Sequence, residues 1–204
     1  MAKVTGLVLA GGRATRMGGQ DKGLVELCGK PMVLHVMERL SPQVEHLVIN
    51  ANRNLDRYRQ YRAPVVSDAF GDFAGPLAGM AAGMAVAESE LICTVPCDSP
   101  LVPADLVQRL YRAWSESANG IAVAWAHGRL QPVFALIPVA LLDDLQAALV
   151  AGERKIDRWY RRHPMVEVDF SDQPDTFLNV NTPAERDALE QRLVRDSDGA
   201  GGLA

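Results

Sequence analysis

The first half of this sequence alternates between short apolar runs and longer segments with helical periodicity. Four runs are short and bounded by glycine or polar residues, as is typical of buried strands, and they cover residues 4–10, 44–50, 64–68 and 91–98. Helices are predicted over residues 31–40 and 75–87 and from residue 103 to about 114. This alternation implies parallel strands joined by right-handed crossovers, with helices on both faces of the sheet. The sequence therefore predicts an α/β fold with a doubly wound, mostly parallel sheet.

The second half is less regular. Strands are expected over residues 121–126, 131–138 and 166–170, and helices over residues 139–150 and 155–162. A last helix is expected to begin after Thr182, a typical N-cap residue that is followed by Pro183 and, three positions on, by Glu185, and to end near Val194. Residues 196–204 carry too little apolar surface to fold. We therefore predict a single domain over residues 1–195 and a disordered tail.

Composition and charge exclude several function classes. The net charge of −4 argues against nucleic acid as a partner, because non-specific binding needs a basic face. The N-terminal apolar stretch is too short for a signal peptide, and charged residues interrupt the chain too often for a membrane span. Three cysteines are an odd and sparse set, so we expect no disulfide framework and take the cytoplasm as the compartment.

A glycine-rich, basic stretch follows the first predicted strand directly. Residues 9–23 read LAGGRATRMGGQDKG and contain five glycines and three cations. Glycine lets backbone N–H groups approach a ligand closely, and the cations can neutralise a polyphosphate. The alternative is a mobile glycine loop with incidental arginines, but Arg16 and Lys22 within one short loop favour a nucleoside triphosphate site.

Two other phosphate-binding loops are excluded. The dinucleotide fingerprint G-x-G-x-x-G occurs in no register of the sequence. A Walker A loop requires serine or threonine after its Gly-Lys pair, whereas Gly29 and Lys30 are followed here by Pro31.

Polar side chains stand at the ends of the predicted strands. The second strand ends at Asn50, the third at Asp68 and the fourth at Asp98, while the first runs into the glycine-rich stretch. Ligands of open α/β sheets bind beyond the carboxyl ends of the strands, where these groups would meet. An aspartate after a strand can also cap a turn. A triphosphate site, however, needs a divalent ion held by few carboxylates and by the phosphates, so we interpret Asp98 as a magnesium ligand.

Five sequence segments together carry a family resemblance. They are LAGG with RMG and DK in residues 9–22, NAN at 50–52, GPLAG at 75–79, PCDSP at 96–100 and NVNTP at 179–183. The first segment alone would indicate only a nucleotidyltransferase, but the ordered set resembles the molybdenum cofactor guanylyltransferases. The resemblance implies a Rossmann-like nucleotidyltransferase fold. It also implies an enzyme that transfers GMP from GTP to the terminal phosphate of molybdenum-bearing molybdopterin and releases pyrophosphate.

The resemblance implies roles for individual residues as well. Those implied to bind the nucleotide are Leu9, Ala10, Gly11, Gly12, Lys22, Asn50, Asp68 and Asp98. Those implied to act in catalysis are Arg16, Lys22 and Asp98, of which Asp98 would hold the cofactor, Mg²⁺.

Two pairs of residues have a functional and a structural interpretation. Asn179 and Asn181 would lie near the α-phosphate or the metal, or would form a loop-capping pair before the last helix. Gly75 and Pro76 would let the base or the pterin approach a helix start, whereas the small residues after them are more simply interpreted as packing that helix on the sheet.

The acceptor site is less defined by the sequence. Arg129 and the basic cluster at residues 154–162 could grip the acidic molybdopterin phosphate, but such a cluster is also typical of a solvated helix face. Cys93 and Cys97 are interpreted as core residues, since no further ligand at metal spacing accompanies them.

Three rival functions remain open from the sequence. They are a CTP-dependent cytidylyltransferase acting on molybdopterin, a sugar-phosphate nucleotidyltransferase, and an inactive nucleotide-binding adaptor for molybdoenzymes. Intact Lys22 and Asp98 argue against the adaptor, which needs neither. The partners that we expect are GTP and molybdopterin, with transient contacts to molybdoenzymes or their chaperones.

Overall fold

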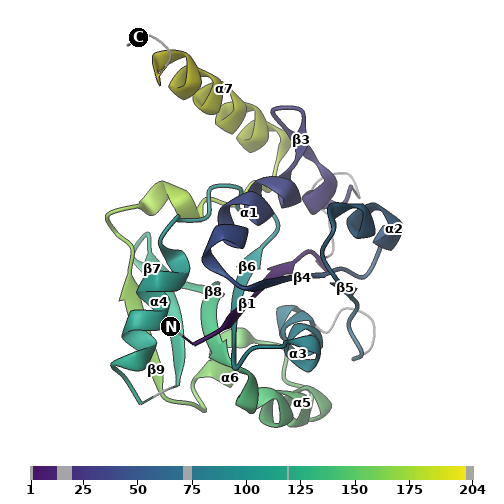
Figure 1. Ribbon diagram of the computed structural model, residues 1–204, viewed down its shortest axis with the longest axis vertical. Coiled ribbons are helices and arrows are strands. Elements are labelled where there is room, and N and C mark those ends of the chain that lie inside the picture. Colours follow the sequence, from purple (N-terminus) through teal and green to yellow (C-terminus); the bar gives the residue numbers. More distant parts are fainter. Residues whose placement is uncertain (1, 13–19, 71–74, 119, 201–204) are drawn as a thin grey trace.

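The computed structural model describes residues 2–12, 20–70, 75–118 and 120–200, with side chains up to residue 196. Within these ranges a seven-stranded sheet lies between two layers of helices (Figure 1). Arg16, one of the predicted site residues, lies outside the described residues. Among the helices of the described ranges, none is long and apolar enough to cross a membrane.

The large sheet has the strand order β5-β4-β1-β6-β8-β7-β9. All neighbouring pairs are parallel except those of β8, which is antiparallel to both β6 and β7, so the prediction of a mostly parallel sheet is confirmed. The strands are β1 (Val4–Leu9), β4 (His46–Asn50), β5 (Val65–Val66), β6 (Leu91–Pro96), β7 (Ile121–Ala126), β8 (Arg129–Pro138) and β9 (Met165–Asp169).

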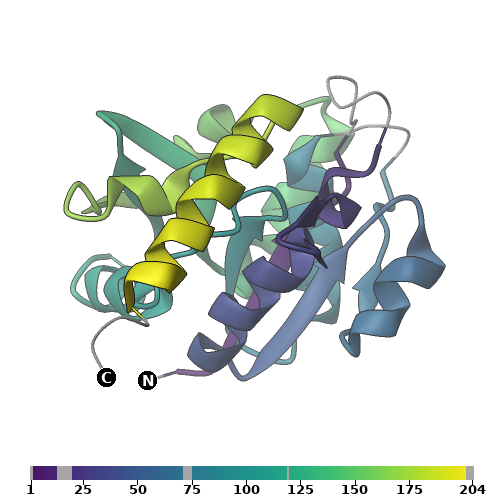
Figure 2. The same ribbon diagram turned by 90° about the horizontal axis from the view of Figure 1, so that it is seen from above.

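Helices cover both faces of this sheet, as predicted (Figures 1 and 2). Side chains alternate along a strand, so Val8 packs in the apolar cluster that contains α1 and α4, whereas Leu7 packs in the cluster that contains α3, α5 and α6. The helices are α1 (Met32–Leu40), α2 (Leu55–Tyr58), α3 (Pro76–Val86), α4 (Leu106–Ser115), α5 (Leu142–Val150), α6 (Ile156–Tyr160) and α7 (Pro183–Ala200).

Helix α3 is buried nearly all round and packs closely on the sheet. A Cβ atom on Gly83 would collide with the Leu7 side chain, and one on Gly79 would collide with the Asn50 amide oxygen. The small residues of this segment therefore let the helix approach the sheet, as the sequence indicated. Cys93 and Cys97 are buried in the opposite cluster, which confirms their interpretation as core residues.

The C-terminal helix corrects one prediction. The α7 helix begins at Pro183 as predicted but continues to Ala200, past the end predicted near Val194, so residues 196–200 are helical where a disordered tail was predicted. The first turns are held by the Thr182 cap and by Leu189, which shares an apolar cluster with Leu27 of a small hairpin formed by β2 (Glu26–Leu27) and β3 (Lys30–Pro31). Once a helix is nucleated in this way, adding a residue costs little free energy. Residues 201–204 lie outside the described part.

The sequence did not predict the small hairpin formed by β2 (Glu26–Leu27) and β3 (Lys30–Pro31). Its turn places Cys28 and Gly29 at φ values of 50° and 72°. Strands of two residues give no periodicity to detect, so this element becomes visible only through its packing against α7. In Figure 1 the hairpin and the base of α7 lie side by side, and the helix projects beyond the body of the protein.

Candidate active site

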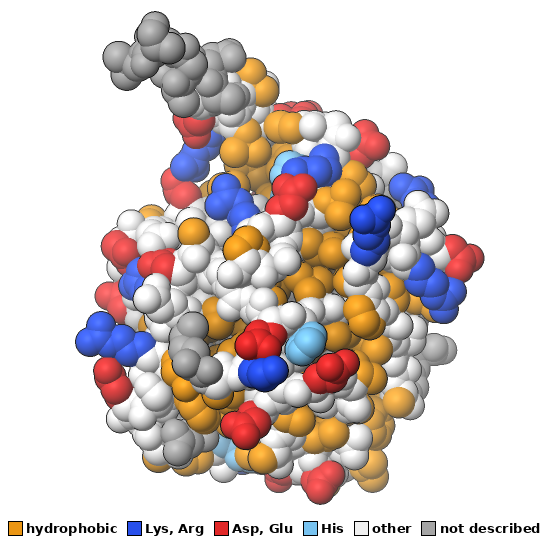
Figure 3. All heavy atoms as spheres, in the orientation of Figure 1, with side chains coloured by type: hydrophobic (Ala, Val, Ile, Leu, Met, Phe, Trp, Pro, Cys, Tyr) orange, Lys and Arg blue, Asp and Glu red, His pale blue; other side chains and the backbone are white. Residues whose placement is uncertain are grey.

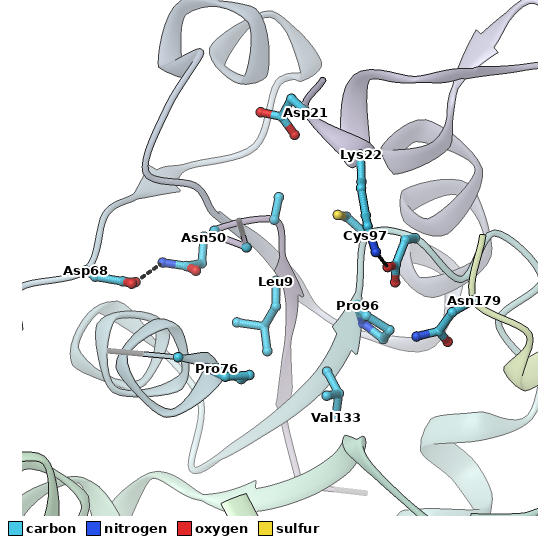
Figure 4. A pocket seen from close by; sticks show the side chains of 15 residues that line it. Leu9, Asp21, Lys22, Asn50, Asp68, Pro76, Pro96, Cys97, Val133 and Asn179 are labelled. Atoms are coloured by element: carbon cyan, nitrogen blue, oxygen red, sulfur yellow. Dashed lines mark hydrogen bonds and ion pairs between the residues drawn. The ribbon is translucent and has the colours of Figure 1, made fainter. Parts of the chain in front are cut away.

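A cavity of about 420 Å³ opens at the carboxyl ends of β1, β4 and β6 (Figure 4). Backbone hydrogen bonds continue beyond the strands and keep their ends aligned: the Ala10 amide donates to the Asn50 carbonyl at 2.7 Å, and the Cys97 amide to the Leu9 carbonyl at 3.0 Å. The predicted site residues that line the cavity are Leu9, Ala10, Gly11, Gly12, Lys22, Asn50, Asp68, Gly75, Pro76, Asp98 and Asn179.

One side of the cavity is formed by an ion pair between the glycine-rich stretch and the end of β6. The Lys22 ammonium lies 2.9 Å from Asp98 Oδ2 and donates a second hydrogen bond to Asn181 Oδ1 at 2.6 Å. Only 22% of the lysine side chain and 12% of the aspartate side chain are exposed. The cation and the carboxylate that the sequence assigned to phosphate and metal therefore meet in one partly buried place.

The segment before α7 brings its two asparagines to this pair. The Val180 amide donates to the Asp98 carbonyl at 2.8 Å, and Asn179 Oδ1 accepts a hydrogen bond from the Ser99 hydroxyl at 2.8 Å. Because side chains alternate in an extended segment, Asn179 and Asn181 turn toward the cavity side while Val180 is buried in the apolar cluster beneath α7.

The segment before α7 also caps this helix, but through backbone amides and the Thr182 and Glu185 side chains rather than through the asparagine side chains. Glu185 accepts hydrogen bonds from the backbone amides of Asn181 and Thr182 at 2.6 and 3.0 Å, and its own amide donates to the Thr182 hydroxyl at 3.2 Å. This is a capping box. The backbone of Asn181 thus belongs to the helix cap, while its side chain, which is not among the lining residues, reaches the cavity only through its contact with Lys22.

A second polar group stands across the cavity from the ion pair (Figure 4). Asp68 accepts hydrogen bonds from Asn50 Nδ2 and from Asn52 Nδ2, both at 2.8 Å, and its amide donates to Asn52 Oδ1 at 2.9 Å. Gly79 on α3 leaves the space that the Asn50 side chain occupies. Asn52 completes this group. It is part of the NAN motif at residues 50–52, but the sequence predicted no role for it.

The start of α3 forms another wall of the cavity, and its position depends on the backbone conformation of Gly75. Gly75 has a φ of 78°, which glycine adopts without strain, and Pro76 then occupies the first helical position. The N-terminus of an eleven-residue helix therefore faces the cavity next to Leu9 (Figure 4).

The basic residues proposed for the acceptor are not brought to this cavity. Arg129 is exposed at the start of β8, in the turn between β7 and β8, and is not among the residues that line the cavity. Arg154 donates to the carbonyls of Leu149 and Glu153, and Arg161 lies 3.8 Å from Asp157. These contacts favour the interpretation of residues 154–162 as a solvated surface.

Four lining residues were missed by sequence reasoning as site members: Asp21, Pro96, Cys97 and Val133. Asp21 directly precedes Lys22, and Cys97 directly precedes Asp98. Their places beside these two predicted site residues were the sequence signal that could have identified them. Burial, and next the charge of Asp98, raises the pKa of the Cys97 thiol, which is therefore neutral at physiological pH. Val133 reaches the cavity from the antiparallel strand β8, and nothing in its local sequence indicated this.

The donor set around Asp98 is small. The described residues hold no group of three or more histidine, cysteine or acidic side chains that could bind a metal ion by themselves. Mg²⁺ commonly takes one or two carboxylates and completes its shell with phosphate oxygens and water. A single carboxylate beside amide oxygens therefore fits Mg²⁺ that enters together with a nucleotide.

Comparison with known proteins first gives the class. The family model described as a MobA-like NTP transferase domain matches residues 6–168, a range that contains the β1, β4 and β6 strand ends and the Lys22–Asp98 pair. The chain is thus a nucleotidyltransferase of this type.

The relatives and solved structures narrow this class. The molybdenum cofactor guanylyltransferase of Ralstonia nicotianae is 52% identical and covers 93% of this chain and 97% of its own length. That of Shewanella loihica is 48% identical and covers 94% and 98%. The Archaeoglobus fulgidus molybdopterin-guanine dinucleotide biosynthesis protein A shares the fold, with a TM-score of 0.78 at 24% identity over 94% of this chain and 99% of that one. The chain belongs to the molybdenum cofactor guanylyltransferase family.

Proposed function

We propose that this protein transfers GMP from GTP to the terminal phosphate of molybdenum-bearing molybdopterin. The products are the guanine dinucleotide form of the cofactor and pyrophosphate. Family membership supports the choice of substrates. The single observation that carries the chemistry is the Lys22–Asp98 pair, 2.9 Å apart, at the edge of a cavity whose opposite wall is polar.

The reaction is an in-line displacement at the α-phosphorus of GTP. A phosphate oxygen of molybdopterin forms a bond to this phosphorus, the bond to the oxygen that bridges to the β-phosphorus breaks, and pyrophosphate leaves with the electron pair. The nucleophile is already ionised at neutral pH, so no general base is required. Such transfers depend on positioning and on neutralisation of charge.

The residues of the cavity divide this work. Backbone groups from Leu9 to Gly12 hold the nucleotide, and Asn50 with Asp68 contacts the nucleoside. Lys22 leaves Asp98 to meet the triphosphate, where Arg16 joins it, while Asn179 and Asn181 orient groups near the α-phosphorus.

Asp98 would hold Mg²⁺ when the nucleotide binds. Held there, the ion would supply positive charge to offset the negative charge that develops on the leaving pyrophosphate. The carboxylate is suited to this because its side chain is largely buried, and the hydrogen bond from the Val180 amide to the Asp98 carbonyl fixes the backbone that carries it.

Product analysis tests the proposal directly. Purified protein is incubated with Mg²⁺, molybdopterin and one of GTP, CTP, ATP or UTP, and the products are identified by mass spectrometry. We expect a guanine dinucleotide and one pyrophosphate per turnover with GTP. A cytosine dinucleotide from CTP would support the cytidylyltransferase instead. Binding of GTP without any product would support the inactive adaptor.

Partners and compartment complete the proposal. We propose that the finished cofactor passes to molybdoenzymes or their chaperones through transient contacts. We also propose the cytoplasm as the compartment, which agrees with three free thiols, at Cys28, Cys93 and Cys97. Arg129 lies on the same sheet edge as the cavity, at the turn after β7, and we keep it as a candidate contact for the acceptor phosphate.

A further inference from the structure

The carboxylate of Asp21 lines the cavity, but the proposed reaction gives it no part. Asp21 is only 8% exposed, and its charge is held by groups around α2. The Tyr58 hydroxyl donates to Oδ1 at 2.6 Å and Asn54 Nδ2 donates to Oδ2 at 3.0 Å. In Figure 4 the Asp21 carboxylate lies apart from the Lys22–Asp98 pair. The Arg53 guanidinium also lies 3.6 Å from Oδ2, so three side chains next to or within α2 hold this carboxylate.

Tyr58 is a permanent donor in this contact. The residue is fully buried, and burial is the main reason that the pKa of its hydroxyl is raised, with smaller effects from Cys97 and Asp21. The hydroxyl therefore stays protonated through the physiological range and always presents its hydrogen to Asp21.

The chain is shaped so that this hydroxyl can reach Asp21. A Cβ atom on Gly23 would lie 2.5 Å from the Tyr58 hydroxyl oxygen, so glycine is required where the tyrosine passes. The short 3-10 helix Lys22–Leu24 begins here, and its Leu24 amide donates to the Asp21 carbonyl at 3.0 Å. Side chain and backbone of Asp21 thus hold the chain immediately before Lys22.

We propose that Tyr58, Asn54 and Asp21 are positioning residues for Lys22. They hold the lysine backbone so that its ammonium points into the cavity, although α2 itself lines none of it. A lysine side chain loses conformational entropy when it binds a phosphate. A backbone that is already held in place reduces the entropy cost of binding. The proposal rests on the proposed function for the identity of the nucleotide.

A double-mutant cycle on GTP affinity tests this coupling. Tyr58→Phe keeps the ring and removes the hydroxyl; by the usual cost of a lost hydrogen bond to a charged group, we expect the dissociation constant for GTP to rise about tenfold. If the hydroxyl acts through Lys22, the same substitution in a Lys22→Gln background changes the affinity by less than about twofold. The four proteins are compared by isothermal titration calorimetry.

Two further variants make the result specific. Tyr61→Phe is the matched control because it removes a hydroxyl from the ring that packs edge-on against Tyr58, on the 3-10 helix Arg59–Tyr61, but leaves the Tyr58 and Asn54 donors to Asp21 in place. We expect it to leave the affinity unchanged. Asn54→Gly removes the other donor at a residue with φ of 52°, which glycine adopts freely. Asn54→Gly should likewise weaken GTP binding in the wild-type background but not in the Lys22→Gln background. It replaces Tyr58→Phe in the cycle if Tyr58→Phe does not fold.

An equal loss of affinity in both backgrounds would overturn the proposal, since a purely structural role is independent of Lys22. Failure of the proposed function gives a different result: wild-type protein then binds another nucleoside triphosphate in place of GTP, and the cycle is run with that nucleotide. A wild-type protein that binds none overturns both.

Discussion

The Lys22–Asp98 contact joins two residues that are 76 positions apart in the sequence. In the free protein the ammonium neutralises a carboxylate that is largely removed from water. A triphosphate offers the lysine a stronger partner and at the same time supplies oxygen ligands for a metal ion. Under the proposed function, binding of nucleotide and exposure of the Asp98 carboxylate to the metal are therefore one coupled event.

Replacement of the carboxylate tests its role in the reaction. Asp98→Asn keeps the side-chain volume but removes the charge that we propose as the metal ligand, so we expect turnover to fall by about 100-fold or more. Pyrophosphate release is the measurement. Asp157→Asn removes the same charge from an exposed position on α6 and should leave turnover unchanged. Asp98→Asn protein that is folded by circular dichroism and retains full activity would exclude the metal role.

Replacement of the lysine tests the order of binding. In wild-type protein the ammonium opposes a divalent cation at Asp98, so we expect Mn²⁺, used in place of Mg²⁺, to bind well only when GTP is present. Lys22→Met removes this opposition, and Mn²⁺ should then bind without nucleotide. Electron paramagnetic resonance of free Mn²⁺ measures both cases. The prediction fails if wild-type and Lys22→Met proteins bind Mn²⁺ equally in the absence of GTP.

At the scale of elements, α3 does more than cover the sheet. Two of its glycines face different neighbours: Gly79 faces Asn50 and Leu9, whereas the nearest side chain to Gly83 is Leu7. Asn50 lines the cavity and is proposed to contact the nucleoside, whereas Leu7 is part of the core. The distance between α3 and the sheet therefore determines where Asn50 can stand.

This difference gives a matched pair of substitutions. Gly79→Ala and Gly83→Ala both overfill a packed interface, and each should lower the free energy of unfolding by about 1 to 3 kcal/mol. Only Gly79→Ala displaces Asn50, so we expect a roughly tenfold loss of GTP affinity for this variant, equivalent to about one hydrogen bond. Denaturant unfolding and calorimetric titration separate the two effects. Equal GTP affinities in the two variants would show that Asn50 does not contact the nucleotide.

At the scale of the whole molecule, the cavity is made by segments from both halves of the chain. Residues 9–12, 21–22 and 97–98 meet Val133 of β8 and Asn179, so nucleotide binding links distant segments. A ligand that binds only the folded protein raises its apparent stability. Thermal unfolding is thus a direct measure of which nucleotide the assembled cavity prefers.

Selectivity is expected to appear in the melting temperature. At a concentration 100 times its dissociation constant, GTP with Mg²⁺ should add about 2.7 kcal/mol of stability, which raises the melting temperature by roughly 5 to 11 °C for a domain of this size. CTP at the same concentration should have a smaller effect. The Asp68→Asn variant provides the control because it weakens the nucleoside contact. A larger rise with CTP would contradict the assignment of GTP.

Sequence alone determined the strands of the first half, the alternation of strands and helices, and the motif residues that surround the cavity, including Lys22, Asp98 and Asn50. These follow from local periodicity and from the rule that parallel strands bring their carboxyl ends to one edge. Only the tertiary structure showed which distant residues meet. Tyr58 donates to Asp21, Gly79 leaves space for the Asn50 side chain, and Val133 lines the cavity. It also decided the β2–β3 hairpin and the full length of α7. Such pairings depend on packing between distant segments, which local sequence does not encode.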